Sequence, residues 1–131
     1  MMLRTLRYNS PAFLWSIVIL TLSLIPSKSI QKIVFLDFVG IDKVGHFGVY
    51  AILAFLLVRG FCKQFNDGVY RLSLAVYSII IGLIYGGILE YLQWRVAPSR
   101  SGDWADFAAN FLGCILGSAF YYIVSRKFNK K

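Results

Sequence analysis

The chain has 131 residues, of which 58% are hydrophobic and only 15% are charged. Soluble domains carry about 25% charged residues, so this composition excludes an ordinary water-soluble protein, and we expect one membrane domain over residues 1–131. The net charge of +8 comes from basic residues at the edges of apolar runs, a pattern that indicates orientation in an anionic membrane and argues against a nucleic-acid partner.

Four apolar runs predict an all-α, multi-pass membrane protein, a bundle of four transmembrane helices. A helix needs about 20 apolar residues to cross the hydrocarbon core. We expect the helices at about residues 8–25, 42–61, 72–94 and 104–125. The first run follows Arg4 and Arg7, as the apolar part of a signal peptide does, but no small-residue cleavage site stands near Pro26. We therefore expect this helix to be retained.

The segment between the first two helices, from Ser27 to Ile41, is amphipathic. Its apolar residues are Ile30, Ile33, Val34, Phe38 and Ile41. We expect this short segment to lie in the outer membrane interface, with its apolar side chains toward the acyl chains.

The basic residues also predict the orientation, because cytoplasmic loops carry an excess of Lys and Arg. With the N-terminus inside, the cytoplasmic side carries Arg4, Arg7, Arg59, Lys63, Arg71, Arg126, Lys127, Lys130 and Lys131. The outer side then carries Lys28, Lys32, Lys43, Arg95 and Arg100. Both termini are therefore predicted to be cytoplasmic.

Polar residues recur on one face of each of the last three predicted helices. They are Asp42, His46 and Tyr50 on the second, Glu90 and Gln93 on the third, and Asp106 and Asn110 on the fourth, with Asp103 directly before it. They also lie at a similar depth in the membrane, in its outer half. At 1.5 Å per residue His46 lies about 6 Å inside Asp42, and Asn110 about 10 Å inside Asp103. Ionisable groups facing lipid cost about 2 to 3 kcal/mol each at the helix centre, so we expect these faces to meet.

We infer a polar pocket that opens to the outer surface. Small residues on the same helix faces would let the backbones approach closely, namely Gly82, Gly86, Gly113 and Gly117. The N-termini of the second and fourth helices would point toward this surface, and Lys43, Arg95 and Arg100 would add positive charge beside them. A phosphate group suits such a site.

Each of these residues also has a purely structural interpretation. Asp42 and Asp103 are suited to capping helix N-termini. Lys43 and Arg95 are suited to reaching lipid headgroups with their charged ends. Glu90 is suited to an ion pair with an arginine. The shared face and level make the set more informative than any one member.

These polar residues also carry a resemblance to a known family. Three blocks follow one another: Asp42-Lys43-x-x-His46, then Glu90-x-x-Gln93, then Pro98-x-Arg100-x-x-Asp103-x-x-Asp106-x-x-x-Asn110-x-x-Gly113-x-x-x-Gly117. Their order resembles the VanZ-like family, and the resemblance covers about Ile25 to Gly117. It implies a small multi-pass protein of the bacterial cytoplasmic membrane. The family takes its name from a protein associated with resistance to the glycopeptide teicoplanin, and it has no established enzymatic reaction.

Our first hypothesis is that the pocket binds or remodels a phosphate-bearing lipid, or an undecaprenyl-linked cell-wall precursor. The binding residues would be Asp42, Lys43, His46, Glu90, Gln93, Arg100, Asp103, Asp106 and Asn110. Membrane lipids are the expected partners. We expect no cofactor and assign no metal-ligating residue.

Two alternatives stay open. In a membrane-embedded hydrolase or transferase that acts on a lipid headgroup, Glu90 or His46 would be the general base. Mg²⁺ held by Asp103, Asp106 and Glu90 would suit that reaction, because Mg²⁺ prefers oxygen ligands. In a purely structural protein the polar faces would only join helices, and each carboxylate would be paired.

Overall fold

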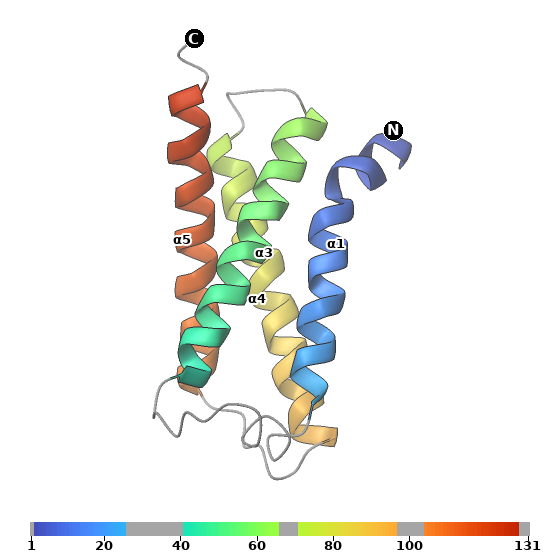
Figure 1. Cartoon of the computed structure of the whole chain (residues 1–131), viewed down its shortest axis with the longest axis vertical. Coiled ribbons are helices and arrows are strands. Elements are labelled where there is room, and N and C mark those ends of the chain that lie inside the picture. The colour runs from blue at the N-terminus through green and yellow to red at the C-terminus, as the bar shows by residue number, and fades with distance from the viewer. Residues whose placement is uncertain (1, 26–40, 66–70, 97–103, 129–131) are drawn as a thin grey trace.

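The computed structural model describes residues 2–25, 41–65, 71–96 and 104–128. They form four helices: α1 (Met2–Leu24), α3 (Ile41–Phe65), α4 (Arg71–Val96) and α5 (Trp104–Phe128). Successive helices run in opposite directions, so the first turn of α1 and the last turn of α5 lie at the same end of the bundle (Figure 1). The predicted all-α class is confirmed for the described residues.

Three of these helices are long and apolar enough to cross a membrane, over Lys43–Phe65, Leu72–Val96 and Trp104–Lys127. The fourth crossing expected of the first helix is not confirmed, because polar residues such as Arg4, Arg7 and Asn9 occupy the first turns of α1. The expected interfacial segment lies outside the described residues, except for Ile41, which begins α3. The chain is a membrane protein with at least these three apolar helices.

The first helix begins at Met2, well before the start expected near residue 8, and continues through Pro11. Proline has no N–H, so it cannot donate to the carbonyl of Arg7 one turn earlier. The Ser10 hydroxyl donates to that carbonyl instead, with an Oγ–O distance of 3.1 Å. A side chain therefore supplies the hydrogen bond that the proline removes, and the N-terminal part of α1 stays helical.

Helix α3 lies at the centre of the bundle and packs most extensively against α5. A Cβ atom at Gly113 of α5 would overlap the carbonyl oxygen of Phe47, and one at Gly117 would overlap that of Ala51. The two backbones are thus close enough that only glycine fits, as expected from these small residues. On the other side of α5, a Cβ at Gly82 of α4 would lie 2.6 Å from Cys114 Sγ.

Helix α1 is joined to the other helices by side chains that donate to backbone carbonyls. Trp15 Nε1 donates to the carbonyl of Val49 in α3 at 2.9 Å, and the Tyr85 hydroxyl of α4 donates to the carbonyl of Ser16. A carbonyl oxygen has two lone pairs, so it can accept these bonds without losing its bond within the helix.

Near the same end as the termini, three uncharged polar residues form an amide network between α1 and α3. Asn9 Nδ2 donates to Gln64 Oε1 at 3.0 Å, and Gln64 Nε2 donates to Thr5 Oγ1 at 2.8 Å. We call Thr5, Asn9 and Gln64 the amide network.

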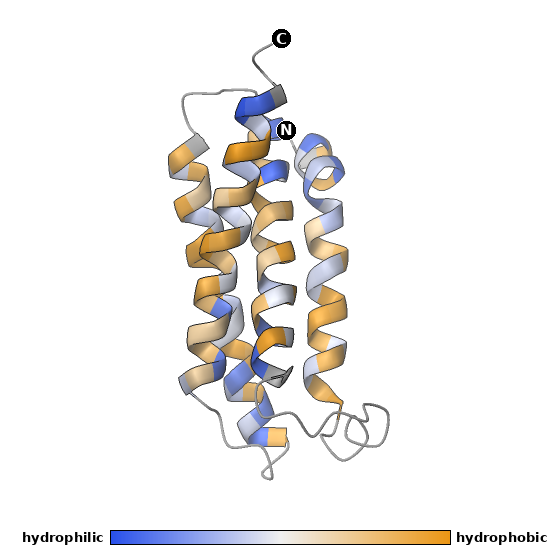
Figure 2. Cartoon of the chain, turned by 60° about the vertical axis from the view of Figure 1, so that its left-hand side comes forward, coloured by the Kyte–Doolittle hydropathy of each residue, from blue (hydrophilic) through white to orange (hydrophobic). Residues whose placement is uncertain are grey.

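The outer surface of the bundle is mostly apolar. Large hydrophobic side chains such as Phe13, Ile84 and Phe120 are more than half exposed. Figure 2 shows hydrophobic residues over much of the helix length and hydrophilic residues toward the two ends. This distribution suits a bundle whose middle faces lipid tails and whose ends face water.

Candidate functional site

Polar side chains of three helices meet at the end of the bundle opposite the termini. The first turns of α3 and α5 and the last turns of α4 lie together there (Figure 1). The members are Lys43 and His46 of α3, Glu90 of α4, and Asp106 and Asn110 of α5. We call these five residues the polar cluster. Their meeting agrees with the shared face and level predicted from the sequence.

An ion pair joins α3 and α5 at the edge of the polar cluster. Lys43 Nζ lies 3.3 Å from Asp106 Oδ1, and the two side chains are 43% and 13% exposed. The lysine side chain is therefore partly exposed, while the aspartate side chain is largely covered. Because an ammonium has three N–H donors, Lys43 can hold Asp106 and a second anionic oxygen at once.

Deeper in the same site, His46 Nδ1 lies 3.1 Å from Asn110 Oδ1. An amide oxygen only accepts hydrogen bonds, so the ring donates from Nδ1, and a neutral ring with this tautomer has its lone pair on Nε2. Asn110 is 1% exposed, and a Cβ at Gly86 would lie 3.2 Å from its Nδ2 and 3.3 Å from the Tyr50 hydroxyl. The absence of a side chain at Gly86 thus leaves room for the amide that orients His46.

Three members of the polar cluster lie close enough to bind one metal ion together. His46, Glu90 and Asp106 each offer one nitrogen or oxygen atom, and these three atoms lie within 4.8 Å of one another. All three residues are half-buried. The sequence suggested an all-oxygen set of Asp103, Asp106 and Glu90, but Asp103 lies outside the described residues. The structure adds His46, which the sequence had suggested only as a base or a phosphate-site residue.

Other predicted site residues are not part of the polar cluster. Gln93 is 7% exposed, and its Nε2 donates to the carbonyl of Ser23 in α1 at 2.9 Å. This hydrogen bond joins α4 to α1. Asp42 belongs to the first turn of α3, but its side chain lies outside the described part of the chain. Arg100 lies outside it as well, so the predicted pocket that includes Arg100 extends beyond the described residues.

Exposed tryptophans lie at the same end of the bundle as the polar cluster. Trp104, the first residue of α5, is 85% exposed, and Trp94, near the end of α4, is 57% exposed. Tryptophan is enriched where hydrocarbon meets water, because its ring is apolar and its N–H is polar. The two residues indicate that the polar cluster lies near a membrane interface.

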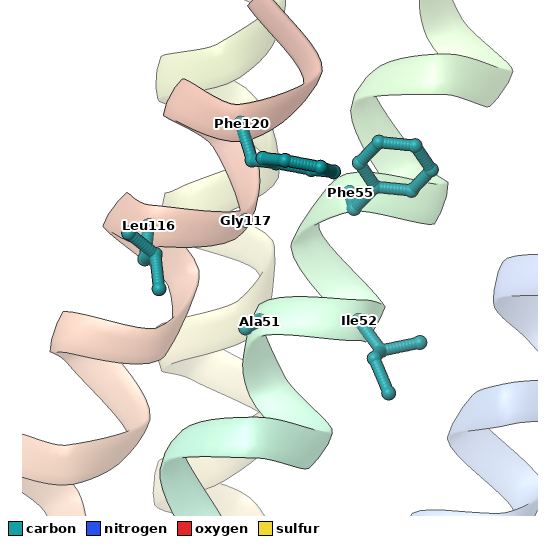
Figure 3. Close-up of a pocket in the computed structure, with 6 residues that line it drawn as sticks. All are labelled: Ala51, Ile52, Phe55, Leu116, Gly117 and Phe120. Carbon is teal, nitrogen blue, oxygen red and sulfur yellow. The ribbon is translucent and has the colours of Figure 1, made fainter. Parts of the chain in front are cut away.

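An apolar groove runs between α3 and α5, with α4 behind them (Figure 3). It has a volume of about 340 Å³ and is lined by Ala51, Ile52, Phe55, Leu116, Gly117 and Phe120. The small Ala51 and Gly117 form its floor, where the two backbones touch. Ala51 lies eight residues after Lys43, about 12 Å along the axis of α3, and both residues contact α5.

The chain is similar to a known protein family. Residues 2–125 match the model of a family described as VanZ/LLP1. No curated protein and no solved structure matches the chain. The matched range contains the whole polar cluster and the apolar groove.

Proposed function

The chain belongs to the VanZ/LLP1 family, and from this premise we propose that its polar cluster binds the phosphate-bearing headgroup of a membrane lipid or of an undecaprenyl-linked cell-envelope precursor. Lipids of this kind present an anionic head directly above apolar chains. A protein that binds one needs a polar site at the membrane surface and an apolar surface beside it.

The observation that carries this proposal is the placement of Lys43 above the apolar groove. Lys43 is partly exposed at the edge of the polar cluster, and it contacts α5 as Ala51 and Phe55 of the groove do. A headgroup phosphate held by Lys43 would leave the acyl chains directed along the groove. His46 and Asn110 lie on the inner side, where they suit hydrogen bonds to the rest of the headgroup.

The proposed location is the bacterial cytoplasmic membrane, with both termini in the cytoplasm and the polar cluster in the outer leaflet. This orientation is tested with single cysteines in a background that lacks Cys62 and Cys114. A membrane-impermeant maleimide added to intact cells should label Trp104→Cys but not Lys127→Cys. The reverse labelling would place the polar cluster on the cytoplasmic side and exclude an outer-leaflet ligand.

Lipid binding is tested by native mass spectrometry of the protein purified with its lipids. We expect a retained phospholipid or phosphate-bearing precursor, and Lys43→Gln should lower its occupancy several-fold because the phosphate loses its ammonium partner. Lys63→Gln is the matched control, since Lys63 is a lysine in the last turn of the same helix. Equal retention in the two variants, or retention of neutral lipids only, would contradict the proposal.

A second candidate, a hydrolase or transferase acting on a lipid headgroup, is favoured by the closeness of His46, Glu90 and Asp106. In that reaction Glu90 or His46 would accept the proton of the attacking group. The purified protein should then convert a retained lipid during incubation, and Glu90→Gln should stop the conversion. Retained lipid of unchanged mass would exclude this candidate.

A link to glycopeptide resistance is a separate proposal, tested by the teicoplanin sensitivity of cells with and without the protein.

A purely structural role is the third candidate, and the Lys43–Asp106 ion pair is a contact that it also predicts. The lipid experiment separates the two. A structural bundle would purify without a defined lipid, and Lys43→Gln would change only its stability.

A further inference from the structure

We propose that His46, Glu90 and Asp106 form a binding site for one divalent transition-metal ion, with Zn²⁺ or Mn²⁺ preferred over Mg²⁺ and Ca²⁺. The three residues come from three different helices, α3, α4 and α5. One candidate ligand atom of each lies within 4.8 Å of the other two.

The upper limit of 4.8 Å on the distances between these atoms is larger than their spacing in a site that holds its metal. Ligand atoms at about 2.1 Å from a metal lie roughly 3.4 Å apart in a tetrahedral arrangement. Binding would therefore draw the three atoms together by up to about 1.4 Å, a movement within reach of side-chain rotations. The helix backbones need not move.

The chemistry of the donors sets the preference among metals. One imidazole nitrogen and two carboxylate oxygens make a mixed set, whereas Mg²⁺ and Ca²⁺ favour oxygen ligands alone. Three protein ligands leave at least one position for water or another oxygen, as in catalytic rather than structural zinc sites. The half-buried state of all three side chains leaves this position within reach of water.

Asn110 provides the support that a metal-binding histidine needs. Such histidines almost always donate their second ring N–H to an oxygen, which fixes the ring and its tautomer. His46 Nδ1 lies 3.1 Å from Asn110 Oδ1, and the neutral tautomer that donates to this oxygen would present its Nε2 lone pair to a metal. Asn110 is itself fully buried beside Gly86 and Tyr50, so its oxygen is held in place.

Substitution of Lys43 tests the metal site separately from lipid binding. Its ammonium lies 3.3 Å from Asp106 and places a positive charge beside the site. A bound metal would be repelled by this charge, so Lys43→Gln should leave the metal affinity unchanged or raise it. The same substitution should weaken lipid retention under the proposed function, so one variant separates the two proposals.

The test uses the full-length protein without a polyhistidine tag, stripped of metals by a chelator in detergent, with no lipid added. Calorimetric titration with ZnCl₂ or MnCl₂ should give one ion per chain, and MgCl₂ should bind at least tenfold more weakly. His46→Gln, Glu90→Gln and Asp106→Asn should each lower the Zn²⁺ and Mn²⁺ affinities at least 100-fold. Asn110→Leu should lower them about 10- to 100-fold, because it removes the partner of the ring.

Asp67→Asn is the matched control, because Asp67 is an acidic residue between α3 and α4. It should bind as the unaltered protein does. A second measurement needs no variant. The chain has one histidine, so a coupling of imidazole nitrogen to bound Mn²⁺ in pulsed electron paramagnetic resonance can arise only from His46. The proposal is overturned if the unaltered protein binds neither ion, if this coupling is absent, or if the three ligand variants bind like Asp67→Asn.

Discussion

Two polar regions of this bundle differ in what they contain and in what they can do. The amide network of Thr5, Asn9 and Gln64 consists of uncharged groups, and its members bond to one another across α1 and α3. The polar cluster at the other end contains a lysine, an imidazole and two carboxylates from three helices. Polar residues in a membrane bundle are therefore not evidence of a site by themselves, since the first set is explained by helix association alone.

The contact between α3 and α5 carries the polar cluster, and a substitution that separates these helices should have the largest effect. Gly117→Ala adds a methyl group that would overlap the carbonyl oxygen of Ala51, a backbone atom that cannot rotate away. We expect a loss of about 1 to 3 kcal/mol from overpacking, measured by denaturant unfolding in detergent. In Gly87→Ala the added atom meets nothing within 4 Å, so this control should gain up to about 1 kcal/mol of helix propensity. Equal stability of the two variants would contradict the close contact.

A substitution in the amide network should lower stability without affecting the polar cluster. Gln64→Leu removes the acceptor for Asn9 and the donor for Thr5. Hydrogen bonds between membrane helices average about 0.6 kcal/mol each, so we expect a loss of roughly 1 kcal/mol in the same unfolding experiment. Lipid retention and metal affinity should stay unchanged. If either fell with Gln64→Leu, the two regions would be coupled and the comparison would be wrong.

The smallest effect is expected from Gln93, which the sequence placed in the binding site. Gln93→Leu removes one hydrogen bond to the carbonyl of Ser23, at a cost of about 0.6 kcal/mol. We expect no change in the lipid that copurifies, because the side chain faces α1. A clear loss of lipid in native mass spectrometry would return Gln93 to the binding site.

The helices and the centre of the polar cluster were predictable from the sequence, because helical phase and depth in the membrane are both counted along the chain. His46, Glu90, Asp106 and Asn110 share a level in three apolar runs, and no lipid-facing arrangement of these groups is favourable. Gln93 has a partner that helical phase did not predict, the carbonyl of Ser23 in α1. Residues three apart are neighbours on a helix surface, so the phase of Gln93 relative to Glu90 does not reveal which adjacent helix its long side chain reaches.

The start of α1 and the amide network were not predicted, because they depend on features that the apolar runs do not identify. The start of α1 was placed too late because the prediction followed the apolar run, which begins near Tyr8, whereas the helix itself extends outward over Arg4 and Arg7. The amide network was missed because Asn9 and Gln64 are 55 residues apart. Its signal in the sequence was the placement of Thr5 and Asn9 on one face of a helix, one turn apart.

The attachment of α1 has a consequence for how this protein tolerates sequence change. Trp15, Tyr85 and Gln93 donate to the carbonyls of Val49, Ser16 and Ser23, and every acceptor is a main-chain atom. An acceptor of this kind persists whatever side chain the position carries. Random libraries should therefore accept many residue types at Ser16 and Ser23 and few at Tyr85 and Gln93, whereas Val49 also packs against the hydrophobic core. For these two pairs the genetic constraint falls on the donating partner.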